Sequence, residues 1–280
     1  MGGAAFILIY LLFLLIMGIP VLVCEFAIGR ASRYSIAEAF ETLEPEGTKW
    51  HWTKWIGILG SYLLMMFYTT VAGWMLYYCF RNIRGDFAEA GTKEVEAGFS
   101  QMLGNAPVMG LWTFILITAG FGICWFGIQN GIEKVSKVMM SVLFLIMIVL
   151  AVRSVFLEGA GEGVRFYLIP DFQKMQEIGI GNVIFGAMSQ AFFTLSIGIG
   201  AMMIFGSYLG KERSLTGEAL SITILDTFVA TMAGFIIIPT CFAYGIEPGS
   251  GPSLIFLTIP NIFAQMPGGQ LLGERCFSCS

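Results

Sequence analysis

The sequence predicts an all-α integral membrane protein, and three observations support this fold class. Of the 280 residues, 56% are hydrophobic and only 12% are charged, whereas a soluble domain has about 25% charged residues. Folded in water, such a chain would expose large apolar patches. Six apolar runs reach the roughly 20 residues that a membrane-spanning helix needs. The content of 35 glycines suits closely packed membrane helices.

The composition also excludes several classes of protein. An ordinary cytosolic enzyme, a nucleic-acid-binding protein and a disordered chain do not fit it, and the formal charge of −4 points to no polyanionic partner. The sole histidine, His51, lies in a polar loop far from any buried serine, so a serine–histidine hydrolase is not expected. Cys276 and Cys279 form a CxxC without a second pair, which makes a zinc or redox site a weak hypothesis. We predict no enzyme activity.

Six segments are predicted to cross the membrane. The first run lacks the basic leading region of a cleavable signal peptide and is too long for one. A shorter apolar stretch, at about residues 252–266, contains Pro260 and predicts a surface or re-entrant helix. The predicted spans are residues 5–28, 56–80, 108–128, 138–157, 181–208 and 219–245.

The fifth run carries the clearest sign of a broken helix. A polar series from Ser189 to Ser196 is followed by Gly198 and Gly200, and glycine costs about 1 kcal/mol relative to alanine in a helix interior. The helix is predicted to unwind near residues 196–200. Unwound backbone at membrane depth is tolerated only where it lines an enclosed cavity, where helix ends can bind cations and polar groups. A close helix crossing at the glycines is the alternative.

Two acidic residues stand out from their apolar surroundings. Asp226 lies inside the sixth run, where a carboxylate costs about 2.5–3.5 kcal/mol on insertion scales. It is interpreted as a cation ligand or proton site that faces the bundle interior, and a hydrogen-bonded structural acid is the alternative. Glu25 follows the first run, either as an interfacial acid paired with a nearby base or as a functional group.

Several motifs, in this order, resemble the neurotransmitter:sodium symporter family, specifically its bacterial amino-acid transporters. They are GGAAF at 2–6, GIP at 18–20 leading to Glu25, GR at 29–30, GIEKVSK at 131–137, QAFFTLS at 190–196 and PGG at 267–269. The resemblance implies a partial inverted-repeat transporter bundle, with the second to seventh helices and external loop helices at about 252–266. It implies a single, truncated transporter domain over residues 1–280, lacking the first and eighth to tenth helices and inactive alone.

The resemblance also implies a substrate site. Tyr68 matches the tyrosine that hydrogen-bonds the substrate carboxylate, and Phe193 matches the aromatic lid over the substrate. Ser196, Ile199 and Gly200 fall on substrate-pocket positions. An aromatic residue is common where Ile199 stands, so the side-chain preference of relatives is not carried over.

Ion and gate positions follow from the same resemblance. Thr194 and Asp226 match first-sodium-site positions, and relatives often have asparagine in place of Asp226. Tyr208 matches a tyrosine of the inner gate. Na+ is the implied coupling ion, with no organic cofactor.

A former chloride site is implied near the sodium position. Tyr10, Gln190, Thr194 and Asp226 surround the place that holds chloride in animal relatives, and Ala230 replaces the serine of chloride users. Because Asp226 can itself supply a negative charge near sodium, the hypothesis is a chloride-independent transporter.

The leading hypothesis is sodium-coupled symport of an amino acid or related small zwitterion across the plasma or inner membrane. Sodium offsets the charges of Asp226 and the substrate carboxylate in a water-poor cavity, so each ligand favours binding of the other. The alternative is a membrane scaffold or partner subunit, which needs no intact ion site. Neither the preferred amino acid nor an oligomeric state is predicted.

Overall fold

The computed structural model describes residues 3–84, 98, 101–125, 133–157, 159–170 and 172–243, and these residues are almost entirely helical. The predicted all-α fold class is therefore confirmed. The predicted helix at about 252–266 and the CxxC of Cys276 and Cys279 lie outside the described residues. Within those residues, five helical runs are long and apolar enough to cross a membrane: Ala4–Ser32, Trp50–Arg81, Ala106–Trp125, Lys134–Val155 and Leu215–Ala243.

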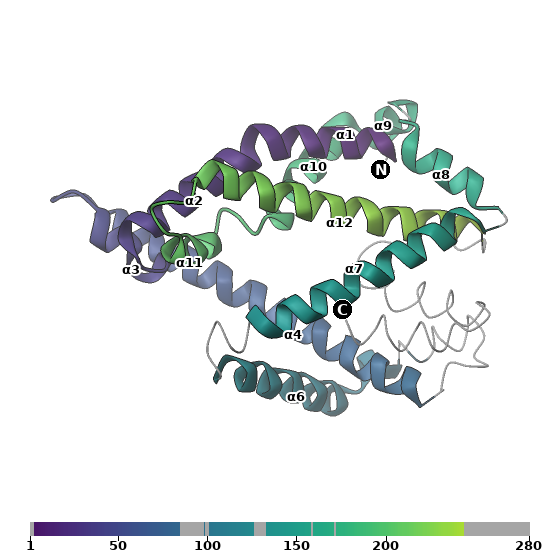
Figure 1. The fold of residues 1–280 in the computed structure, drawn as a ribbon, viewed down its shortest axis with the longest axis horizontal. Coiled ribbons are helices and arrows are strands. Elements are labelled where there is room, and N and C mark those ends of the chain that lie inside the picture. The colour runs from purple at the N-terminus through teal and green to yellow at the C-terminus, as the bar shows by residue number, and fades with distance from the viewer. Residues whose placement is uncertain are drawn as a thin grey trace. The chain divides into compact units, whose positions relative to one another are not determined.

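The chain divides into two compact units. The first unit consists of Met1–Met65 and Arg165–Thr231, and the second of Met66–Val164 and Met232–Ser280. The α-helices, labelled in Figure 1, are α1 (Ala4–Phe13), α2 (Ile19–Ser32), α3 (Ile36–Leu43), α4 (Thr53–Ile83), α6 (Ala106–Trp125), α7 (Lys134–Val155), α8 (Ala160–Leu168), α9 (Phe172–Ile178), α10 (Ile180–Thr194), α11 (Ala201–Tyr208) and α12 (Leu215–Ala243).

In the first unit, α11 packs along α2 and α10 packs along α1 (Figure 1). A π-helical segment, Leu14–Gly18, joins α1 to α2, just before Pro20, which has no N–H to donate to the helix. Two glycines allow the backbones of α2 and α11 to touch. A Cβ atom at Gly29 would collide with the Met203 carbonyl, and one at Gly206 would stand 2.6 Å from the Phe26 carbonyl oxygen.

The core of the first unit surrounds the region between α10 and α11. Its residues are contributed by α1, α2, α10, α12, the π-helical segment and the α10–α11 connection. They are Tyr10, Leu14, Leu22, Phe26, Ala187, Ala191, Leu195, Ile197 and Ala219.

The predicted fifth span, residues 181–208, is not one helix. α10 ends at Thr194 and α11 begins at Ala201, so the backbone is non-helical between them. The break predicted near residues 196–200 is confirmed. The alternative, a close approach at the glycines, accompanies the break, because a Cβ atom at Gly200 would collide with the Ile36 side chain.

In the second unit, α6 packs closely on the second half of α4. A Cβ atom at Gly73 of α4 would stand 2.9 Å from the Thr113 Cα of α6. The Trp112 ring lies 5.9 Å from that of Tyr77 and 5.3 Å from that of Phe80, measured between centroids. The contact between α4 and α6 therefore consists of a close approach at Gly73 and a cluster of aromatic rings around Trp112.

A proline lies in the part of α12 that belongs to the second unit. Pro239 has no N–H, so the Phe235 carbonyl, four residues earlier, loses its usual intrahelical donor. The Ser154 hydroxyl of α7 donates to this carbonyl oxygen at 2.8 Å. A neighbouring helix thus replaces the hydrogen bond that the proline removes.

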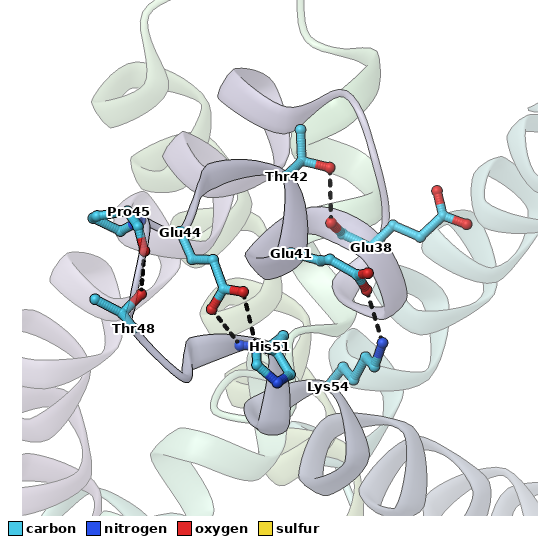
Figure 2. A network of polar contacts seen from close by, with 8 residues as sticks. All are labelled: Glu38, Glu41, Thr42, Glu44, Pro45, Thr48, His51 and Lys54. Carbon is cyan, nitrogen blue, oxygen red and sulfur yellow. Dashed lines mark hydrogen bonds and ion pairs between the residues drawn. The ribbon is translucent and has the colours of Figure 1, made fainter.

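The connection from α3 to α4 is held by polar contacts (Figure 2). Lys54 Nζ donates to Glu41 at 2.8 Å. The Glu44 carboxylate accepts from the His51 backbone N–H at 3.0 Å and lies 2.7 Å from its ring Nδ1. Hydrogen bonding from Lys54 lowers the pKa of Glu41. Removal from water raises the pKa of Glu44, but its hydrogen bonds with His51 outweigh this and hold the pKa below its ordinary value.

Candidate functional site

The end of α10 explains how a membrane helix stops within the first unit. Ile197 N–H donates to the Phe192 carbonyl at 3.2 Å, and Ser196 N–H donates to the Phe193 carbonyl at 3.1 Å. These two bonds form a Schellman motif, which closes the last turn of a helix. Its left-handed residue, usually glycine, is here Ser196, with φ at 52°. A non-glycine residue in this conformation is strained, and such strain clusters at functional sites.

Glu25 of α2 holds the other end of the break. Its carboxylate accepts from the backbone N–H groups of Gly198 at 2.7 Å, Gly200 at 3.4 Å and Met202 at 3.1 Å. The residue is only 5% exposed. A negative group is favourable at a helix N-terminus, where N–H groups lack intrahelical acceptors. The interpretation of Glu25 as an interfacial acid paired with a base is therefore wrong.

Asp226 of α12 meets the C-terminal end of α10. The Thr194 hydroxyl, on the last residue of α10, donates to Asp226 Oδ2 at 3.0 Å. Tyr10, only 8% exposed, lies beside both residues. The C-terminus of a helix carries partial negative charge, and the Asp226 carboxylate adds to it. The combined field favours a cation.

Thr227 contributes a further oxygen to this cluster. Its Oγ1 is buried and lacks a hydrogen bond of normal geometry in the described part of the chain, although it lies near the Tyr10 hydroxyl. A buried polar group without a partner is costly. Carboxylate and hydroxyl oxygens are ligands that suit hard cations. The oxygens of Thr194, Asp226 and Thr227 therefore form a chemically suitable candidate site for sodium.

A cavity of about 540 Å³ lies beside the break in the first unit. Most of its lining is apolar, with two serine hydroxyls. Phe193, Ser196 and Ile199, which were predicted to belong to a substrate pocket, line it together. The full lining is Met17, Leu64, Met188, Ser189, Phe192, Phe193, Ser196, Ile197 and Ile199.

Gly200, Tyr68 and Tyr208 were also predicted to belong to the site, but they are not among the residues that line this cavity. Gly200, with φ at 72°, caps α11 and donates to Glu25 rather than lining the cavity. Tyr68 follows the cavity residue Leu64 by four residues on α4, so both occupy one face of that helix. Tyr208, the last residue of α11, is 65% exposed.

The two remaining residues of the proposed former chloride site are exposed. Gln190 lies on α10 and Ala230 on α12, the latter one turn after Asp226. The structure thus brings Tyr10, Thr194 and Asp226 into one cluster and adds Thr227. Among the residues it describes, no group of three or more histidine, cysteine or acidic side chains could hold a metal ion.

Comparisons with known proteins identify the family. A family model described as the sodium:neurotransmitter symporter family matches residues 1–96 and 86–279. The chain belongs to the sodium:neurotransmitter symporter family. It is 37% identical to the sodium-dependent transporter YhdH of Bacillus subtilis, matching 96% of this chain and 59% of that protein. A sodium-dependent transporter of Haemophilus influenzae is 34% identical, with 96% and 60% matched.

A solved structure is also similar. The crystal structure of MhsT in complex with L-phenylalanine superposes with a TM-score of 0.90 and 37% identity, covering 99% of this chain and 62% of that chain. The chain therefore spans about three fifths of the length of these relatives. The family, together with the apolar helices, makes this a multi-pass membrane protein of a transporter family rather than of an enzyme family.

Proposed function

We propose that the chain forms the ion and substrate site of a symporter that couples sodium to the uptake of an amino acid or related small zwitterion across the plasma or inner membrane. The observation that carries this proposal is the hydrogen bond between Thr194 and Asp226 at the C-terminal end of a broken membrane helix. The partial negative charge of the α10 C-terminus and the Asp226 carboxylate lie together there. A carboxylate inside a membrane is costly without a cation. Thr194, Asp226 and Thr227 are the proposed sodium ligands.

The substrate is proposed to bind in the cavity beside the break. Ser196 offers a hydroxyl, Tyr68 is proposed to bind the substrate carboxylate, and Phe193 is proposed to cover the substrate as a lid. The apolar lining by Met17, Leu64, Met188 and Ile199 favours a substrate with an apolar side chain. The L-phenylalanine bound to MhsT supports this choice of class. Gly200 shapes the pocket backbone, and Tyr208 is the proposed inner-gate residue.

Chloride independence is proposed for the same site. Asp226 supplies a fixed negative charge beside sodium, while Ala230 offers no hydroxyl to a chloride ion. Tyr10 and Gln190 are the other two residues proposed to belong to the former chloride-site region. The double variant Asp226→Asn with Ala230→Ser removes the charge and supplies the hydroxyl, so its uptake is expected to become chloride-stimulated. Strict chloride dependence of the unmodified site would contradict the proposal.

A chimera with MhsT tests the transport function. The chain replaces the 62% of MhsT that it matches, and uptake of radiolabelled L-phenylalanine is measured in proteoliposomes with sodium or potassium outside. We expect sodium-dependent uptake that Asp226→Ala abolishes. Uptake that is equal in potassium, or unchanged by Asp226→Ala, would contradict the proposal. Complete loss of sodium-dependent binding and uptake in the unmodified chimera would instead favour a scaffold. The chain alone is expected not to transport.

A further inference from the structure

Two glycines on α4 face the segment between α10 and α11. A Cβ atom at Gly57 would stand 2.8 Å from the Ile199 carbonyl oxygen and would collide with the Ile36 side chain of α3. A Cβ atom at Gly60 would stand 2.9 Å from Ile199 Cγ2 and 3.5 Å from Ile199 Cβ. Neither position has room for a side chain. The two glycines differ in what they touch, because Gly57 meets backbone and Gly60 meets only the side chain.

The Ile199 side chain lies between Gly60 and the cavity. Ile199 lines the cavity together with Leu64, which follows Gly60 by one helical turn on α4. The backbone beside Ile199 is held in place, because its carbonyl lies against Gly57 and the next residue, Gly200, donates to Glu25. The Ile199 side chain, which borders the cavity, is therefore the group that must move when position 60 gains a methyl group.

We propose that Gly60 is a specificity-determining position, which acts through Ile199 to set the size of the apolar side chain that the cavity accepts. The inference rests on the proposed function, because it assigns the cavity to the substrate. Gly60 is a positioning residue and touches no substrate. A methyl group at position 60 pushes Ile199 inward and narrows the cavity, whereas a methyl group at position 57 disturbs the break itself.

The first experiment measures the cavity in the full chain without any transport. Leu64→Cys places a thiol on the cavity wall, and its modification rate is measured with a small and a bulky methanethiosulfonate reagent. We expect Gly60→Ala to slow the bulky reagent severalfold more than the small one. Adding Ile199→Ala should restore the bulky reagent's rate. Gly110→Ala on α6, where a Cβ atom meets nothing within 4 Å, is the matched control, and the chain without Leu64→Cys gives the background from native cysteines.

The second experiment measures selectivity in the MhsT chimera. One methylene is worth about 10- to 200-fold in the discrimination of apolar substrates, so Gly60→Ala is expected to raise KM for L-phenylalanine about tenfold relative to L-alanine. The ratio of the two kcat values should stay unchanged, and Ile199→Ala should rescue the KM ratio. If Gly60 had only a structural role, Gly60→Ala would change KM for both substrates equally. Adding Ile199→Ala would then not restore either KM.

The outcomes separate this inference from the proposed function. Equal slowing of both reagents, or failure of Ile199→Ala to rescue, overturns the role of Gly60. Narrowing of the cavity without any change in selectivity overturns its role in specificity while leaving sodium-coupled uptake intact. If the unmodified chimera takes up neither amino acid, the proposed function fails, and the specificity role fails with it.

Discussion

Two membrane helices of this protein lose backbone hydrogen bonds, and they respond differently. Between α10 and α11 of the first unit the helix stops, and the Glu25 carboxylate accepts hydrogen bonds from three backbone N–H groups. In the part of α12 that belongs to the second unit the helix continues through Pro239, and the Ser154 hydroxyl donates to the single carbonyl that is left without a donor. A carboxylate can satisfy several donors at once, whereas a hydroxyl repairs one missing bond.

The two regions show when a helix can open within a membrane. In the absence of water, each unpaired backbone group costs several kcal/mol, so a helix can open only where another group replaces all the lost bonds. Glu25 does so at the N-terminus of α11. The C-terminus of α10, with Thr194 and Asp226, is the proposed cation site. At Pro239 the helix is continuous, so no helix end is available there.

Removal of the Glu25 carboxylate should have the largest effect. Glu25→Ala leaves three buried N–H groups without their acceptor, and an unsatisfied buried group costs about 1–3 kcal/mol. We expect a destabilisation of about 3 kcal/mol or more and faster amide hydrogen exchange at Gly198, Gly200 and Met202. Thermal unfolding in detergent and exchange mass spectrometry measure these effects. Glu46→Ala, at an exposed position, is the control. Unchanged exchange at the three amides would contradict the assigned role.

Ser154→Ala should have a smaller effect, because the lost hydroxyl has a single proton to donate. The expected destabilisation is about 1 kcal/mol, measured as a lower melting temperature. A double-mutant cycle sharpens the test, because Pro239→Ala restores an N–H to position 239 that can donate to the Phe235 carbonyl. Ser154→Ala should then cost measurably less in the Pro239→Ala background. An equal cost in both backgrounds would show that Ser154 does not compensate for the proline.

The acids near the connection from α3 to α4, exposed Glu41 and half-buried Glu44, should have the smallest effect, because water competes for their contacts (Figure 2). The pKa values of Glu41 and Glu44 lie below their ordinary value of 4.5. A lowered pKa in the folded state stabilises the protein above the unfolded-state pKa, and this contribution is lost as pH falls through the folded-state pKa. The melting temperature difference between unmodified protein and Glu44→Gln should therefore be constant near neutral pH.

Below about pH 4.5, the melting temperatures of unmodified protein and Glu44→Gln should converge, because protonation removes the charge that the variant already lacks. Thermal unfolding across about pH 3 to 7 measures the convergence. A difference that grows as pH falls would contradict the lowered pKa of Glu44. The same titration leaves the backbone contacts around Pro239 unchanged, since they include no titratable group.

The sequence was sufficient to predict the break and the acid, because both violate the rules of a lipid-embedded helix. Polar residues followed by Gly198 and Gly200 predict poor helix continuity, and Asp226 is costly in an apolar run. Their proximity to each other was implied only by family resemblance. The structure adds that the last residue of α10, Thr194, makes the contact with Asp226.

Other features required three-dimensional information. The partners of Glu25 are backbone N–H groups more than 170 residues away, and no side-chain pattern marks them. Thr227 directly follows Asp226, but only its buried hydroxyl beside Tyr10 indicates a role. The importance of Gly60 depends on the side chain that lies against it. The short helices α8 and α9 carry too few apolar residues to be distinguished from a loop.

We propose that Asp226 holds sodium beside the broken helix. The most direct measurement is the binding of radioactive sodium to the MhsT chimera, with competition by unlabelled sodium or potassium. We predict saturable binding that sodium but not potassium displaces, and an affinity at least about tenfold lower in Asp226→Ala, corresponding to about 1.4 kcal/mol. Identical sodium affinity in the unmodified chimera and in Asp226→Ala would contradict the account.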